Sequence, residues 1–170
     1  MSSQEITIKH KIHSKALESI KRAFYNTGEV LKHRQVTNTH LLLGVLATGN
    51  NDTTLPIPRI LRGAGADYEK LRLFLVGNFE LLSPNPGAEL KLSTYGKQTL
   101  ARASKIAKRR ATSEAQNSII TSDLVVAILR SREPLLAEAL KSMDIDKSAL
   151  LAKLSDNTSQ NRPQHLQAVS

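Results

Sequence analysis

The chain has 170 residues, of which 40% are hydrophobic and 23% charged, enough for one sizeable globular domain or two small units that share a core. Cysteine is absent, which excludes disulfides and thiolate chemistry, and no apolar run approaches the roughly 20 residues of a membrane span. The net charge of +9 permits nucleic acid, acidic lipid or acidic protein as a partner and selects none of them.

The first half of the chain predicts an arm and four helices. Residues 1–11 lack helical periodicity, whereas later segments place apolar residues three and four apart behind capping residues or proline. The helices are predicted from Ser14 to near Gly28, from Asn38 or Thr39 to Leu46, from Pro58 to Leu61, and after Asp67.

The second half repeats this programme after a connector. The stretch "SPNPGAELK", residues 83–91, holds two prolines and a glycine and is predicted as a linker. Four helices are predicted beyond it: from Ser93 or Thr94 to about Thr112, behind the cap Thr121, from Pro134, and behind the cap Asp146. The tail 155–170 is rich in Ser, Asn and Gln and is predicted to be disordered.

Two pairs of motifs indicate that one module occurs twice. The stretch "VTNTHLLLGVL" at 36–46 is similar to "IITSDLVVAIL" at 119–129, an offset of 83 positions. Further on, "RILRGAGADYEKL" at 59–71 is similar to "EALKSMDIDKSAL" at 138–150, an offset of 79. The same order and nearly constant offsets indicate an internal repeat.

The repeat predicts an all-α fold in which eight helices form two pseudo-symmetric four-helix repeats packed into one domain. A half of roughly 70 residues is marginal alone, so each half is expected to bury its apolar face against the other. The predicted divisions are an arm at 1–11, repeat 1 at 12–82, a linker at 83–91, repeat 2 at 92–154 and a disordered polar tail at 155–170.

These motifs resemble the double Clp repeat, the N-terminal domain of the Clp/Hsp100 unfoldases. Its pattern, T-x-H-L-L-L-G-L-L followed by R-I-L-x-x-x-G-x-D-x-x-K-L, is matched closely at 38–46 and 59–71 and more distantly at 121–129 and 138–150. The resemblance covers about residues 12–154. It implies a domain that docks substrates or adaptor proteins for an ATP-driven unfoldase and its protease.

The motor of those unfoldases has no counterpart in this sequence. No G-x-x-x-x-G-K-[ST] motif occurs, and "STYGKQT" lacks the earlier glycine and the preceding strand. The resemblance therefore implies a non-enzymatic accessory or adaptor that binds Clp subunits, adaptors or clients. The alternative is the N-terminal domain of a full-length Clp ATPase. A cytoplasmic location is expected, with the plastid stroma as the alternative in a photosynthetic eukaryote.

One family feature is missing. Some relatives carry Glu in a T-E-H triplet, where it helps to receive a phosphoarginine-tagged substrate. The matching positions here are Thr39 and Ser122, and the partner position, usually Thr, is His13 in the first copy and Ser93 in the second. Because both carboxylates are absent, phosphoarginine recognition by that route is not expected.

The remaining candidate features favour structural interpretations. His10 and His13 are three apart but have no acidic or Cys partner nearby, so no metal, cofactor or catalytic site is predicted. The aliphatic blocks Leu41–Leu43 and Leu124–Val126 are predicted to be core.

A basic helix face formed by Arg102, Lys105, Lys108 and Arg109 is by default solvated. It also supports a rival hypothesis, a small basic nucleic-acid-binding protein, against which stand 4% aromatic residues and no helix-turn-helix signature. The candidate protein-binding residues are His13, Thr39, His40, Ser93, Arg102, Lys105, Arg109 and Ser122.

Overall fold

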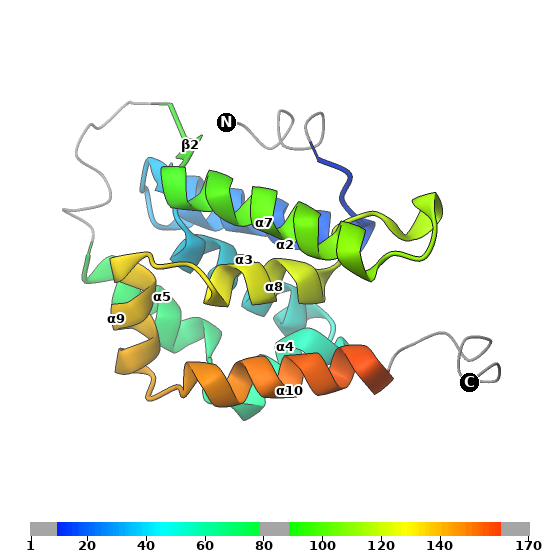
Figure 1. The fold of residues 1–170 in the computed structure, drawn as a ribbon. Coiled ribbons are helices and arrows are strands. Elements are labelled where there is room, and N and C mark those ends of the chain that lie inside the picture. Colours follow the sequence, from blue (N-terminus) through cyan, green and yellow to red (C-terminus); the bar gives the residue numbers. More distant parts are fainter. Residues whose placement is uncertain (1–9, 79–88, 161–170) are drawn as a thin grey trace.

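The computed structural model describes residues 10–78 and 89–160, and this part of the chain contains eight α-helices, which confirms the predicted all-α class (Figure 1). None of the helices in the described ranges is long and apolar enough to cross a bilayer. The first repeat contributes α2 (Ser14–Tyr25), α3 (Asn38–Asn51), α4 (Pro56–Gly63) and α5 (Tyr68–Val76). The second contributes α7 (Thr94–Arg110), α8 (Thr121–Leu129), α9 (Pro134–Ser142) and α10 (Lys147–Gln160).

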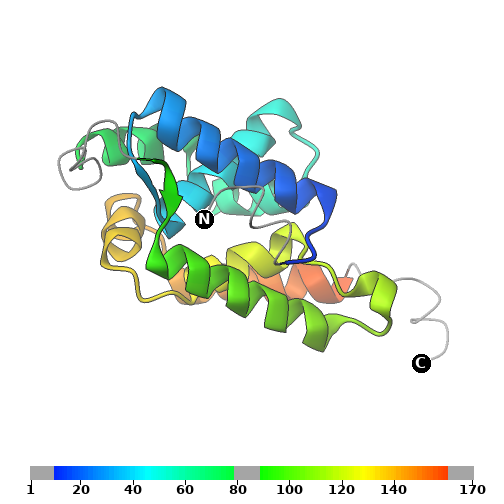
Figure 2. The same cartoon turned by 90° about the horizontal axis from the view of Figure 1, so that it is seen from above.

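The central helices are α3 and α8. Helices α2 and α7 cover them on one face, and α4, α5, α9 and α10 lie on the other (Figures 1 and 2). The core includes Leu41–Leu43, Leu124 and Val125, all fully buried. Val126 is partly buried and packs against this core, so both aliphatic blocks lie where they were predicted. A helix that is apolar on all sides needs neighbours on all sides, and this position provides them.

The repeat is reproduced bond by bond in the turns that follow α4 and α9. Gly65 (φ 108°) and Asp144 (φ 55°) both adopt the left-handed conformation that ends a helix. The residue after each returns its N–H to the preceding helix, Ala66 to the Leu61 carbonyl at 2.9 Å and Ile145 to the Leu140 carbonyl at 3.0 Å. Asp67 and Asp146 then cap the next helix, as predicted.

Short extended segments join the two repeats reciprocally. Strand β1 (Gln35–Val36), just before α3, pairs in parallel with β2 (Lys91–Leu92), just before α7. At the pseudo-equivalent place, Ile12 before α2 bridges Ile119 before α8. In each case the segment that leads into the outer helix of one repeat is hydrogen-bonded to the segment that leads into the central helix of the other. The pairing adds a minimal two-residue ladder to a helical fold.

Helix α3 begins at Asn38, as predicted, but two predicted caps and the start of α4 differ by one or two residues from those observed. Helix α3 is capped by Thr37, not by Asn38 or Thr39, because Thr37 is the last extended residue and its Oγ1 accepts the His40 N–H at 3.4 Å. Helix α8 has Ile120 at its cap position and begins at Thr121. Helix α4 begins at Pro56 rather than at Pro58, since a proline is tolerated at either of the first two helical positions.

Several predicted helix ends also differ from those observed. Helix α3 continues to Asn51, five residues past the predicted Leu46, and α4 to Gly63, two residues past Leu61. Helix α7 ends at Arg110, two residues before Thr112. Helix α10 runs to Gln160, so the predicted disordered tail starts six residues too early. No Pro or Gly interrupts the sequence before Pro163, and buried Leu154 anchors the last turns. Most of the predicted arm and linker, and residues 161–170 of the tail, lie outside the described residues.

Helices α2 and α3 approach closely at Gly44. A Cβ at this position would lie 2.2 Å from the Ser19 carbonyl oxygen and 2.8 Å from Ala23. Replacing Gly44 with Ala must therefore push the helices apart. We expect the free energy of unfolding to fall by about 2 kcal/mol or more in urea titrations.

Gly63 is the control, because a Cβ there meets nothing within 4 Å. Gly63→Ala should change the free energy of unfolding by less than about 1 kcal/mol and in the stabilising direction. Equal stability of Gly44→Ala and the wild type would contradict the close helix approach.

Candidate functional site

The structure brings the family-motif positions together across the repeats, not within them. His13 caps α2, and its N–H donates to the Ile119 carbonyl at 2.8 Å, which places it beside the start of α8 that carries Ser122. Ser93 caps α7, and its N–H donates to the Val36 carbonyl at 2.9 Å, beside the start of α3 that carries Thr39. The reciprocal pairing of the segments causes this exchange.

Four of the candidate binding residues are buried at or next to the start of a helix: Thr39, His40, Ser93 and Ser122. Ser93 Oγ accepts the Gly96 N–H at 3.0 Å, and the Thr39 hydroxyl donates to a carboxylate at 2.9 Å. Four candidates remain at or near the surface. His13, Lys105 and Arg109 are exposed, whereas Arg102 is partly buried and donates to the Ala127 carbonyl at 3.3 Å.

Glu133 is the residue that sequence reasoning missed. It precedes α9 in the second repeat, and its side chain caps α3 in the first. One carboxylate oxygen accepts the Asn38 N–H at 3.0 Å, and the other accepts the Thr39 N–H at 3.3 Å and the Thr39 hydroxyl at 2.9 Å. Ser131 completes the cluster, because its Oγ accepts the Asn38 amide at 2.8 Å and the Glu133 N–H at 3.2 Å.

Glu133 is only 4% exposed, and burial raises the pKa of its carboxyl group while the hydrogen bonds from α3 oppose that shift. The first-turn N–H groups of a helix carry partial positive charge and need acceptors, which the carboxylate supplies. No local sequence pattern predicts the contact between Glu133 and the start of α3, because its partners lie 94 and 95 positions away. The carboxylate is saturated and enclosed, so it does not form an open anionic site beside Thr39.

A buried histidine pair supports the other side of the α3 start. The Thr37 N–H donates to His40 Nδ1 at 3.0 Å, which places the His40 proton on Nε2, from where it donates to His33 Nδ1 at 2.9 Å. Burial lowers the pKa of His33 to about 4, and burial together with repulsion from His33 lowers the pKa of His40 to about 3. Both rings are therefore neutral near pH 7.

The second repeat stabilises the matching junction with an ion pair. Asp123 stands where the first repeat has His40, and it accepts the Ile120 N–H at 3.1 Å, as His40 accepts that of Thr37. Arg110 then donates to Asp123 at 2.8 Å and to the Ser118 carbonyl at 2.9 Å. The equivalent backbone N–H groups, of Thr37 and Ile120, are therefore bonded by a neutral histidine pair in the first repeat and by an ion pair in the second.

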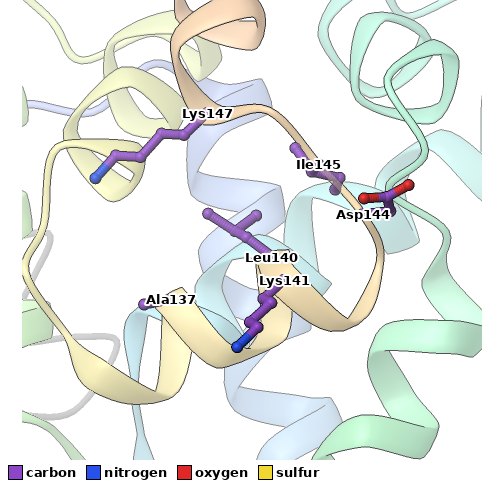
Figure 3. Close-up of a pocket in the computed structure, with 6 residues that line it drawn as sticks. All are labelled: Ala137, Leu140, Lys141, Asp144, Ile145 and Lys147. Atoms are coloured by element: carbon purple, nitrogen blue, oxygen red, sulfur yellow. The ribbon is translucent and has the colours of Figure 1, made fainter.

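Two further features were considered as sites: the histidines near the start of the described chain and a hollow beside α9. Within the described ranges, no group of three or more His, Cys, Asp or Glu residues could hold a metal ion, and His10 and His13 precede α2 and do not share a helix face. An open hollow of about 350 Å³ lies between α9 and the start of α10, with lysine side chains from both (Figure 3). Its lining consists of Ala137, Leu140, Lys141, Asp144, Ile145 and Lys147.

Comparison with known proteins gives one family and one fold. Residues 11–117 match the family model described as the Clp repeat (R) N-terminal domain. A search of curated proteins finds no match.

The solved structures similar to this chain include the Hsp104 N-terminal domain from Candida albicans, with a TM-score of 0.67, 14% identity, and coverage of 90% of this chain and 95% of that one. The N-terminal domain of the chaperone ClpD from Arabidopsis thaliana has a TM-score of 0.67, 16% identity, and coverage of 88% and 95%. A chain from structural work on a malarial protein secretion system has a TM-score of 0.63, 15% identity, and coverage of 89% of this chain and 97% of that one. At such identities the likeness shows the fold.

Replacing Glu133 with Ala leaves the N–H groups of Asn38 and Thr39 without their acceptors in a buried place. We expect the free energy of unfolding to fall by about 3 kcal/mol, measured by urea denaturation. Glu138→Ala, on the exposed side of α9, should change it by less than about 0.5 kcal/mol. Similar effects of the two substitutions would show that Glu133 does not stabilise the α3 start.

The histidine pair predicts a loss of stability in mild acid. The unfolded chain takes up protons near the ordinary histidine pKa of 6.5, whereas folded His33 and His40 do so only near 4 and 3. Their contribution is therefore complete above pH 6.5 and is lost as the pH falls toward 4. Between about pH 7 and pH 5 the free energy of unfolding should fall by on the order of 2 kcal/mol or more.

His40→Asn tests this assignment, because the Asn oxygen can still accept the Thr37 N–H but does not titrate. The variant should show about half of the wild-type pH dependence between about pH 7 and pH 5. Glu133 acts in the opposite direction, since its raised pKa makes the folded state take up a proton first on acidification. An unchanged pH dependence in the variant would exclude the histidine pair as its origin.

Proposed function

Because the chain belongs to the Clp repeat N-terminal domain family, we propose that it is a non-enzymatic protein-binding module of a Clp chaperone–protease system. It acts as an accessory or adaptor that docks substrates, adaptors or Clp subunits. The observation that carries the proposal is the family match over 11–117 on a chain with the fold of Clp/Hsp100 N-terminal domains.

The environment of the buried polar residues supports a binding role over a catalytic one. Glu133, His40 and Asp123 are enclosed, and each accepts backbone N–H groups at the start of a central helix. These groups hold the scaffold rigid and do not face solvent. Partners are therefore expected on the outer helices, where His13, Lys105 and Arg109 are exposed.

The same fold serves the alternative in which this sequence is the N-terminal domain of a full-length Clp ATPase. Protein docking is the role in both cases, and the length of the native reading frame separates them. We place the protein in the cytoplasm, or in the plastid stroma in a photosynthetic eukaryote, where Clp systems meet their clients.

Affinity purification from the native cell tests the proposed function. The immobilised chain should recover Clp ATPase or protease subunits, a Clp adaptor or a Clp client, identified by mass spectrometry. A folded helical domain of the same net charge serves as the control bait. Recovery of no Clp component above this control would contradict the proposal.

A second measurement distinguishes an adaptor from a client. An adaptor should remain intact when the recovered Clp complex is supplied with ATP, whereas a client is unfolded and degraded. Degradation of this chain at the rate of a known client would exclude the adaptor role.

A further inference from the structure

The two outer helices, α2 and α7, are structurally equivalent. Both cover the same face of the molecule (Figure 2). A π-helical turn, Asn26–Val30, continues α2. With an offset of 80 positions, five inward-facing residues of this first segment are buried in register with five of α7. The buried pairs are Ala16 with Gly96, Ser19 with Thr99, Ile20 with Leu100, Ala23 with Ala103, and Thr27 with Ala107. The fold therefore places similar demands on both segments at these five positions, whereas buried Gly28 corresponds to exposed Lys108.

Their charges differ sharply. Residues 14–30 contain three basic and two acidic residues, a net charge of +1, whereas the equivalent residues 94–110 contain six basic and no acidic residues. The two acids of the first copy, Glu18 and Glu29, correspond to Gln98 and Arg109 in the second. Packing does not require this change, because the equivalent helix folds with mixed charges.

The ion pairs differ in the same way. Glu18 pairs with Arg22 at 3.3 Å and lies 4.0 Å from Lys15, so α2 neutralises part of its own charge. On α7, Arg102 and Arg110 are bonded inward to the protein. The other four basic side chains are exposed and form no ion pair within the described residues: Lys97, Lys105, Lys108 and Arg109.

These four side chains share an arc of about 120° on the outer face of α7, given about 100° per residue. Lys97 and Lys105 are separated by about 12 Å along the axis, and Lys108 and Arg109 lie about 5 Å further on. We propose that this face docks an acidic segment of a partner protein. The inference rests on the proposed function and names the chemistry by which a partner is recognised.

Protein is favoured over nucleic acid as the occupant. The face offers four cations over about 18 Å of one convex helix, fewer than the six to ten phosphate contacts typical of nucleic-acid sites. Helix α7 contains a single aromatic residue, the exposed Tyr95, so it does not offer a row of aromatic rings on which successive bases could stack. An extended peptide advances about 3.3 Å per residue, so carboxylates about four residues apart match Lys97 and Lys105.

The test restores the charge pattern of the first copy. The variant Q98E/R109E gives α7 the two acids that residues 14–30 carry, both at exposed positions, and lowers the net charge by three. The matched control K21Q/R62Q/K153Q also lowers the net charge by three, at exposed positions outside α7. Helical circular dichroism and thermal melting establish that both remain folded.

Binding is measured by fluorescence anisotropy with a fluorescein-labelled peptide in which Glu and Asp alternate with Ser and Gly. Q98E/R109E should weaken binding at least about tenfold and the control less than about threefold, because local charge and not net charge governs the contact. Equal weakening by both variants, or no binding by the wild type, would overturn the proposal.

An oligonucleotide of equal net charge serves as the competing ligand. Tighter binding of the oligonucleotide than of the peptide, lost in Q98E/R109E, would also overturn the proposal and assign the face to nucleic acid. Failure of the peptide to bind while affinity purification still recovers a Clp component would leave the proposed function standing and exclude only the α7 surface.

Discussion

The start of each central helix is the constraint on which the fold depends. Helices α3 and α8 are enclosed by the rest of the domain, so their first backbone N–H groups cannot be satisfied by water. The acceptors must come from the protein, and at α3 they come partly from the opposite repeat through Glu133. Burying these helix starts therefore requires both repeats to be folded and in contact, which makes the domain one cooperative unit.

The reciprocal segment pairing serves the same constraint. Val36 and Ile119 are the extended residues that lead into α3 and α8, and each accepts a hydrogen bond from the cap of the opposite outer helix, Ser93 or His13. The position of an outer helix in one repeat is thus tied to the position of a central helix in the other. Family-motif residues that are distant in sequence meet because of this exchange.

Much of the fold could be predicted from the sequence because the repeat recurs both in the helical patterns and in the turn and capping residues between them. The left-handed residues Gly65 and Asp144 and the caps Asp67 and Asp146 recur at one offset, and their local hydrogen bonds recur with them. The Glu133 cluster was not accessible, because its partners lie 94 and 95 positions away and no local sequence pattern relates them. The histidine pair was hidden for a related reason, since His33 lies in an irregular turn where no periodicity places it.

Comparison of the copies also separates what the fold requires from what it permits. At the central helix starts, His40 with His33 and Asp123 with Arg110 are different chemistries for one task, so the task is conserved and the residues are not. On the outer helices five buried positions match while the net charge of the segment diverges from +1 to +6. Self-repulsion among four exposed cations is mildly unfavourable for a helix, and the first copy shows that the scaffold accommodates a mixed pattern. The helix dipole favours Lys108 and Arg109, which lie in the last turn of α7, but it does not favour Lys97 near the first turn or explain the absence of acids. The part of the charge pattern that neither packing nor the helix dipole requires is most simply explained by a partner.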